Sequence, residues 1–158
     1  MQAANVSQLK KELQFRSREE LLEICLRLSK FKKENKELLT YLLFESEDEM
    51  GYVGSVKREV DAQFEEINTK TWYFIKKSIR KILRNLKKFI RYSGKKETEV
   101  ELLLYFCEKL KEFPKDIQQN KTLANLYERQ LALAQKKMLS LHEDLQHDFK
   151  MQIEELNL

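Results

Sequence analysis

The sequence has few of the residues that form turns and few of those that bind metals. Only three of its 158 residues are glycine, one is proline and two are histidine. A sheet of many strands needs many tight turns, whereas leucine, lysine, glutamate and glutamine, all good helix formers, are abundant here. We therefore predict an all-α protein and, from the chain length, a single helical-bundle domain over residues 1–158.

The sequence also lacks a long apolar run. The longest runs, Leu38–Phe44 and Leu102–Cys107, are far shorter than the roughly 20 residues that cross a bilayer. The first residues contain no uninterrupted apolar stretch followed by a small-residue cleavage pattern, so a signal peptide is not expected. These absences predict a protein without a transmembrane segment, located in the cytoplasm.

The two cysteines, Cys25 and Cys107, do not belong to a Cys-x-x-Cys motif. Each falls on the apolar stripe of a predicted helix, where a free thiol behaves as a small hydrophobic group. We interpret both as buried structural residues and expect neither a disulfide nor a reactive thiol.

Signals of enzymatic activity are almost absent. The sequence has no glycine-rich phosphate loop and no Gly-x-Ser-x-Gly motif. His142 and His147 are five residues apart, which places them roughly 140° apart around a helix, too far to share a metal ion. A helical di-iron site needs Glu-x-x-His on two helices, and the nearest pattern here, Asp144-x-x-His147, occurs once. We expect no catalytic residue, no metal and no cofactor.

The N-terminal third is expected to form one short and one long helix. Val6 to Phe15 offers a short, frayed helix, so that residues 1–16 are expected to be frayed. Ser17 and Glu20 have the spacing of a capping box, in which each side chain satisfies a backbone N–H at the helix start. From Leu21 to Leu42 the apolar positions keep steps of three and four, which predicts a single helix that ends near Phe44.

An acidic helix is expected next. Ser46 and Glu49 repeat the capping-box spacing. Between Glu45 and Thr69 there are eight acids against two cations, a net charge of −6. The predicted core positions of this helix are Val53, Val56, Val60, Phe64 and Ile67.

A basic helix follows, from about Thr71 to Ser93, and Gly94 is well placed to end it in the left-handed conformation. Residues 70–96 contain eleven lysines and arginines and no acid, so that the rest of the chain, whose total is +4, carries −7. At about 100° per residue, the apolar side chains fill an arc of roughly 120° and the cations an adjoining arc of roughly 140°. The apolar arc comprises Trp72, Ile75, Ile79, Ile82, Leu83, Leu86, Phe89 and Ile90. The cationic arc comprises Lys76, Lys77, Arg80, Lys81, Arg84, Lys87, Lys88 and Arg91.

The C-terminal part predicts two further helices. Thr98 and Glu101 form a third capping-box pattern, and Pro114 stops the helix that follows. From about Thr122 a last helix is expected to run nearly to the C-terminus. Its apolar positions have the spacing of a coiled coil, which suggests either an elongated bundle or a dimer. These positions are Leu131, Ala134, Met138, Leu141 and Leu145. The predicted fold is an elongated antiparallel bundle of about five helices, with long N-terminal and C-terminal helices.

The cationic arc has several interpretations. In the first, the preceding acidic helix folds back against it and its carboxylates offset part of the charge. In the second, the arc is exposed and binds the phosphates of nucleic acid, with Trp72, Tyr73, Phe74 and Tyr92 available to stack on bases. Binding to a membrane surface is disfavoured, because the apolar arc would have to leave the core. In the remaining interpretation, the arc binds an acidic protein partner or a second copy of the chain.

Four segments resemble parts of a family of uncharacterised all-helical bacterial proteins, and the resemblance covers most of the chain. It implies a bacterial cytoplasmic protein, and it assigns no activity, ligand or functional residue. The segments are FKKENKELLTYLLFES (Phe31–Ser46), IRKILR (Ile79–Arg84), IRYSG (Ile90–Gly94) and LHEDL (Leu141–Leu145).

We therefore expect a non-catalytic interaction or structural module whose partner is another protein or a second copy of itself, as a homodimer. The alternative is a nucleic-acid-associated protein that binds phosphates through the basic helix 70–96. Whether the arc from Lys76 to Arg91 is covered in the fold decides between the two.

Overall fold

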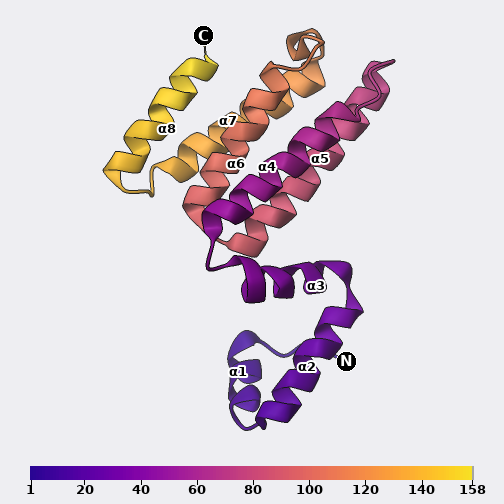
Figure 1. Ribbon diagram of the computed structural model, residues 1–158, viewed down its shortest axis with the longest axis vertical. Helices are drawn as coiled ribbons and strands as arrows, with labels where there is room; N and C mark the ends of the chain where they lie inside the picture. Colours follow the sequence, from indigo (N-terminus) through magenta and orange to yellow (C-terminus); the bar gives the residue numbers. More distant parts are fainter. Residues whose placement is uncertain (158) are drawn as a thin grey trace. The chain divides into compact units, whose positions relative to one another are not determined.

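The computed structural model describes residues 1–157 and is all-helical over that range, as the sequence predicts (Figure 1). It contains eight α-helices there, more than the five or so expected, with a π-helical turn over Tyr41–Glu45 and a 3-10 turn over Ile117–Gln119. The α-helices are α1 (Val6–Gln14), α2 (Arg18–Phe31), α3 (Lys33–Thr40), α4 (Glu49–Glu65), α5 (Trp72–Ser93), α6 (Lys96–Lys111), α7 (Lys121–Met138) and α8 (Glu143–Leu156). None of the described helices is both long and apolar enough to span a bilayer.

The 158-residue chain, for which the sequence predicts a single helical-bundle domain, divides into two compact units. The N-terminal unit is Met1–Phe44 and the C-terminal unit is Glu45–Leu158. Each unit is described on its own.

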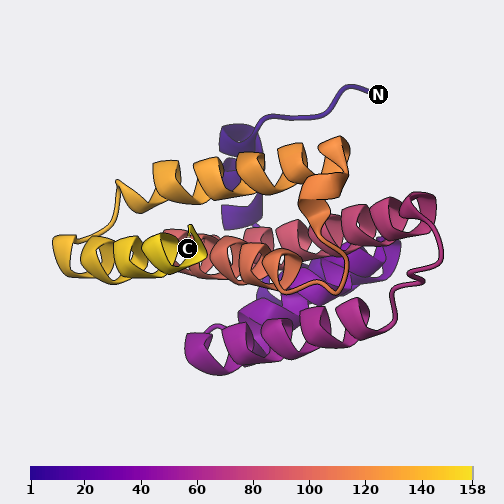
Figure 2. The ribbon, with the colours of Figure 1, turned by 90° about the horizontal axis from the view of Figure 1, so that it is seen from above.

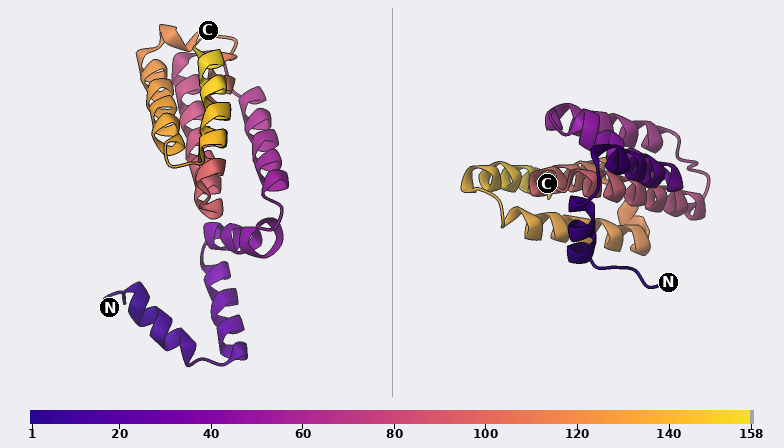
Figure 3. Two further views of the ribbon diagram at one scale, coloured as in Figure 1. Left: turned by 90° about the vertical axis from the view of Figure 1, so that its left-hand side faces the viewer. Right: turned by 90° about the horizontal axis from the view of Figure 1, so that it is seen from below.

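Helix α6 is the central helix of the C-terminal unit and contacts α4, α5, α7 and α8. Figures 1, 2 and 3 show these five helices lying alongside one another. A helix that is covered on several sides must be apolar around much of its circumference. Accordingly, α6 contributes seven side chains that are at most 1% exposed: Val100, Leu102, Leu103, Leu104, Phe106, Cys107 and Leu110.

All five core positions predicted for the acidic segment are buried, Val53, Val56, Val60 and Phe64 within α4 and Ile67 just beyond its end. The predicted start of α4 is wrong, because the N-cap is Asp48, whose carboxylate accepts from the Gly51 N–H at 3.0 Å, and not Ser46. The capping box predicted at Thr98 is also wrong. Thr98 lies inside the first turn of α6, where its hydroxyl donates to Glu49 Oε2 of α4 at 3.1 Å.

The long C-terminal helix is interrupted, contrary to the prediction. Helix α7 ends at Met138, and α8 begins after His142, whose Nδ1 accepts from the Asp144 N–H at 3.2 Å. Gln146 Nε2 donates to the Leu141 carbonyl at 2.8 Å, which satisfies a backbone acceptor at the break. Of the predicted coiled-coil seam, Leu131, Ala134 and Met138 are buried within this unit, where α7 contacts α6, whereas Leu141 and Leu145 lie beyond α7 and are half-buried.

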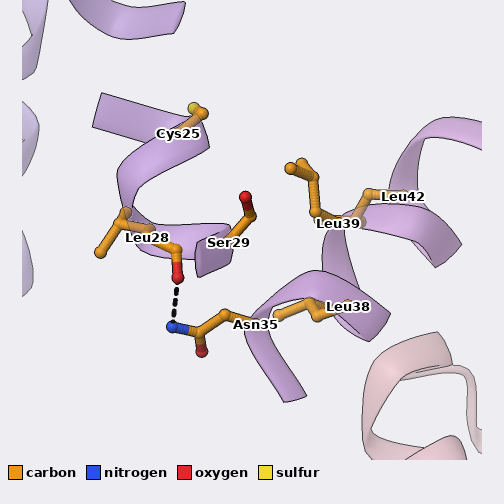
Figure 4. A pocket seen from close by; sticks show the side chains of 7 residues that line it. All are labelled: Cys25, Leu28, Ser29, Asn35, Leu38, Leu39 and Leu42. Atoms are coloured by element: carbon orange, nitrogen blue, oxygen red, sulfur yellow. Dashed lines mark hydrogen bonds between the residues drawn. The ribbon is translucent and has the colours of Figure 1, made fainter. Parts of the chain in front are cut away.

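The long N-terminal helix is interrupted as well. Lys32 adopts an extended backbone (φ −141°, ψ 148°) between α2 and α3. Figure 4 shows how Asn35 Nδ2 donates to the Leu28 carbonyl at 2.8 Å, replacing a hydrogen bond that a continuous helix would have made. The capping box of Ser17 and Glu20 is confirmed at the start of α2.

The two cysteines lie in different environments. Cys107 is buried and free, as predicted, whereas Cys25 is free but exposed. Cys25 lines a hollow of about 210 Å³ between α2 and α3, with Leu28, Ser29, Asn35, Leu38, Leu39 and Leu42. The prediction that Cys25 lies on a buried stripe is therefore wrong, because the N-terminal unit buries almost no apolar side chain.

Candidate polyanion-binding face

The candidate site lies on α5, whose bounds match the prediction. Thr71 caps the helix start, where its hydroxyl oxygen accepts from the Phe74 N–H at 3.3 Å. Gly94 ends the helix in the left-handed region at φ 68°, a conformation that disfavours residues with a Cβ. Both ends of the helix are therefore fixed by residues that the sequence identifies.

The apolar arc of α5 anchors the helix to the C-terminal unit. Six of its eight predicted positions are buried, while Trp72 and Phe89 are half-buried at its edges. The buried positions are Ile75, Ile79, Ile82, Leu83, Leu86 and Ile90. Because this stripe is packed into the core, the rotation of α5 is fixed and its cations must point away from the core.

The cationic arc lies on the surface of the C-terminal unit. Five of its eight side chains are exposed and the other three are half-buried. The exposed ones are Lys77, Arg80, Lys81, Arg84 and Arg91, and the half-buried ones are Lys76, Lys87 and Lys88.

Two adjoining surface hollows bring the eight cations together. The larger, of about 730 Å³, is lined by Tyr73, Lys76, Lys77, Ser78, Arg80, Lys81 and Arg84. The smaller, of about 370 Å³, is lined by Arg80, Leu83, Arg84, Lys87, Lys88 and Arg91. The hollows share Arg80 and Arg84, so together they form one continuous cationic face, which we call the α5 face.

Helix α4 does not supply, for most of the α5 face, the paired countercharge that the first interpretation requires. Seven cations of the α5 face, all except Lys88, form no ion pair with any residue between 1 and 157. Glu59, Glu65 and Glu66 of the acidic segment likewise have no ion-pair partner in the described chain. At its edge the face meets one carboxylate, since Glu66 lines a hollow together with Lys81, without an ion pair.

The charges of α4 that do form pairs are directed elsewhere. Glu49 Oε2 accepts from Ser93 Oγ at 2.7 Å and lies 3.6 Å from Lys95 Nζ, beyond the C-terminal end of the α5 face. Asp61 accepts from the Tyr105 hydroxyl and lies 3.3 Å from Lys109 Nζ, and both of these partners belong to α6. These charges of α4 therefore contact α6 and the C-terminal end of α5, and they do not pair with the seven cations named above.

Aromatic side chains lie at the N-terminal end of the face. Tyr73 is 65% exposed and lines the larger hollow, and its ring contacts the neighbouring ring of Phe74 at a centroid distance of 5.5 Å. Trp72 is half-buried, with Lys115 Nζ 5.6 Å from its ring centroid. Of the four aromatics considered for stacking, Tyr73 is the one placed among the cations.

The groups with displaced pKa values lie away from this face. Burial is the main cause that raises the pKa of the Cys107 thiol to about 12, and the nearby Glu108 and Glu128 add to it. Burial and the hydrogen bond to Asp61 raise the pKa of Tyr105 well above its usual range. Both groups belong to α6, and their raised pKa values keep them uncharged at neutral pH. In the described part of the chain no three Asp, Glu, His or Cys side chains are grouped as a metal site would require, and His142 and His147 are exposed.

Sequence reasoning located every cation of the α5 face but missed a second surface. Leu21, Cys25, Leu28, Leu39 and Leu42 were expected to form the buried seam of one helix, yet none of them is buried. These residues were predicted to be buried from the same spacing of three and four that predicts core positions elsewhere. That spacing shows which side chains share a helix face, but it does not show whether another helix covers that face. Comparison with family models, with curated proteins and with solved structures finds no match for this chain.

Proposed function

We propose that this protein is a non-catalytic, all-helical binding protein that holds the phosphate backbone of nucleic acid on the α5 face. One observation carries the proposal: the eight cations line two adjoining hollows, and seven of them, all except Lys88, form no ion pair with any described residue. A concentration of unneutralised cations attracts polyanions and gains further affinity from the counterions that the polyanion releases.

The dimensions of the face suit a strand of nucleic acid. Lys77 and Arg91 are fourteen residues apart, which spans about 21 Å of helix axis at 1.5 Å per residue. One strand of B-DNA carries a phosphate about every 3.4 Å along its axis, so roughly six phosphates fit along the face. Tyr73 in the larger hollow favours a single strand, because an unpaired base can stack on an exposed ring.

A membrane surface fits the face less well. A helix that lies on a bilayer inserts its apolar side chains between the lipids. In α5 those side chains are packed into the C-terminal unit, with Ile75 and Ile79 fully buried. The remaining alternative, an acidic protein, is separated from nucleic acid by the experiment that follows.

The proposal is tested by the anisotropy of labelled single-stranded and double-stranded oligonucleotides over a salt series. The test variant combines Lys77→Gln, Arg80→Gln, Arg84→Gln and Arg91→Gln, all at exposed positions. We expect wild-type binding to weaken steeply with salt, and the slope of log K against log salt to fall by about 0.7–0.9 for each phosphate contact that the variant loses.

A matched control removes the same charge from another part of the C-terminal unit. It combines Lys121→Gln, Arg129→Gln, Lys136→Gln and Lys150→Gln, which are exposed side chains of α7 and α8. We expect this control to keep the wild-type slope. The proposal is overturned if the wild-type protein does not bind either oligonucleotide at low ionic strength, or if the two variants lose binding equally.

A further inference from the structure

The N-terminal unit has almost no core of its own. Tyr41 is the one hydrophobic residue buried within residues 1–44, and α1 buries no side chain. The exposed large hydrophobics of this unit include Val6, Leu9, Leu13, Phe15, Leu22, Ile24, Leu26, Leu28, Phe31, Leu38, Leu42, Leu43 and Phe44. The largest apolar patch on a typical monomer is about 300–600 Å² and is often an interaction site.

The exposed apolar side chains of α2 include a two-heptad stripe. Leu21, Ile24, Leu28 and Phe31 follow one another at steps of three, four and three, the spacing with which two helices interdigitate. Leu21 is half-buried, whereas Ile24, Leu28 and Phe31 are 37%, 57% and 76% exposed. The stripe is therefore built to contact another helix and is left largely open within the unit.

The charges of α2 indicate which kind of helix would contact this stripe. Within α2, Arg18–Glu23 contains three acids and one cation, and Arg27–Phe31 contains two cations and no acid; Lys32 and Lys33 follow directly beyond the helix end. Two copies of α2 packed antiparallel place the acidic half of each against the basic half of the other. Parallel copies would place like charges together, which opposes association.

We propose that two copies of this chain associate through antiparallel packing of α2 against α2, around a two-fold axis near the middle of the helix. A two-fold dimer uses the same patch on both copies, so the patch must be self-complementary, and reversal of α2 meets that requirement for charge. This interface uses other residues than the α5 face and than Leu131, Ala134 and Met138 of α7, which are buried within the C-terminal unit.

The apolar surface of the N-terminal unit extends beyond the α2 stripe. Burial of a large apolar side chain removes roughly 60–120 Å² from water. Ile24, Leu28 and Phe31 therefore offer on the order of 100–200 Å² per copy, and the thirteen exposed side chains of the whole unit offer on the order of 450–900 Å². A stable interface of standard size needs about 800 Å² from each partner, so the pairing of α2 must also bring in apolar side chains of the neighbouring helices.

The oligomeric state of the full chain is measured by sedimentation velocity over a concentration series. The test variant is Ile24→Gln with Phe31→Gln, at exposed positions where a polar side chain disturbs no core. The control is Leu139→Gln with Met151→Gln, which removes two exposed apolar side chains from the C-terminal unit. We expect a wild-type dimer, an unchanged control, and a dissociation constant raised about 100-fold or more in the test variant.

A second pair of variants tests the charges without removing apolar surface. Arg27→Glu with Lys30→Glu makes α2 acidic, and Glu19→Lys with Glu23→Lys makes it basic, all at exposed positions. Each variant alone is expected to dimerise more weakly than the wild type, and an equimolar mixture is expected to recover the dimer. Loss of helical circular dichroism in any variant identifies misfolding separately from dissociation.

The orientation is measured with spin labels, because Cys25 lies near the middle of α2 and is exposed. In an antiparallel dimer, labels on Cys25 lie close together, whereas labels on Arg18→Cys in a Cys25→Ala background lie roughly 20 Å farther apart along the axis. Equal distances at both positions would overturn the antiparallel arrangement. A wild-type monomer at every concentration, or a dimer that persists in the Ile24 and Phe31 variant, would overturn the proposal as a whole.

Discussion

The two units use the same amphipathic spacing and reach opposite outcomes. Between residues 45 and 157, which the structure describes, thirty hydrophobic side chains are buried in the C-terminal unit, against one, Tyr41, in the N-terminal unit. In the C-terminal unit, helices α4, α5, α7 and α8 all pack against α6. In the N-terminal unit the stripes of α1 and α2 remain largely exposed. The periodicity of a helix thus fixes which side chains share a face, and the number of available partner helices decides whether that face becomes a core.

The comparison is tested most severely by two phenylalanines. Phe106 is fully buried in α6 and its ring contacts Phe64 at 6.0 Å, whereas Phe15 is 84% exposed at the end of α1. We expect Phe106→Ala to lower the free energy of unfolding by about 3–5 kcal/mol, because it removes buried surface and leaves a cavity. Phe15→Ala is expected to change it by less than about 0.5 kcal/mol.

Both changes in the free energy of unfolding are measured by urea unfolding monitored by circular dichroism. A loss at Phe15 as large as that at Phe106 would mean that the N-terminal unit possesses a core. The contrast between the units would then fail.

The C-terminal unit could be predicted from the sequence better than the N-terminal unit could. In α5, the cap residue Thr71, the stop at Gly94 and the apolar arc all specify the same helix, and each is confirmed. The two missed breaks, at Lys32 and between α7 and α8, contain neither glycine nor proline. At each break a side chain donates to a backbone carbonyl, Asn35 to Leu28 and Gln146 to Leu141, and periodicity does not reveal these hydrogen bonds.

The candidate site shows the same division between what periodicity gives and what it leaves open. The helical wheel placed all eight cations correctly on one face, because that placement depends only on α5 itself. Whether α4 covers them depends on the rotation of α4. Asp61 is directed to Tyr105 and Lys109 of α6, and no local pattern in α4 indicates this choice.

The two cysteines, one buried and one exposed, are expected to affect the pH dependence of stability differently. Burial holds the Cys107 pKa at about 12 in the folded protein, against about 8.5 for a free thiol. Above pH 8.5 the unfolded chain loses a proton that the folded protein keeps, so stability falls as the pH rises. The slope approaches about 1.4 kcal/mol per pH unit, and the expected loss is about 1 kcal/mol between pH 8.5 and 9.5, before tyrosines with an ordinary pKa near 10 are mostly ionised.

Urea unfolding at a series of pH values checks this slope. Cys107→Ala should flatten it, whatever stability the substitution itself removes at neutral pH. Cys25→Ala is the matched control, because that thiol is exposed in the N-terminal unit and should leave the slope unchanged. If both variants keep the wild-type slope, Cys107 does not titrate differently in the folded and unfolded states.

The smallest expected effects concern one buried polar side chain in each unit. Ser29 Oγ of α2 donates to the Leu26 carbonyl at 2.7 Å, whereas Gln130 Oε1 of α7 is buried with no hydrogen-bond partner among the described residues. An unsatisfied buried acceptor costs about 1–3 kcal/mol, so replacing it with an apolar group of similar shape removes a penalty. We expect Gln130→Met to raise the free energy of unfolding by about 1 kcal/mol, and Ser29→Ala to lower it by about 0.5–1 kcal/mol.

Opposite signs would show that the well-packed unit tolerates a defect which its large core offsets, while the open unit depends on local hydrogen bonds. Two losses of stability would instead indicate that Gln130 is satisfied, by an ordered water molecule for example.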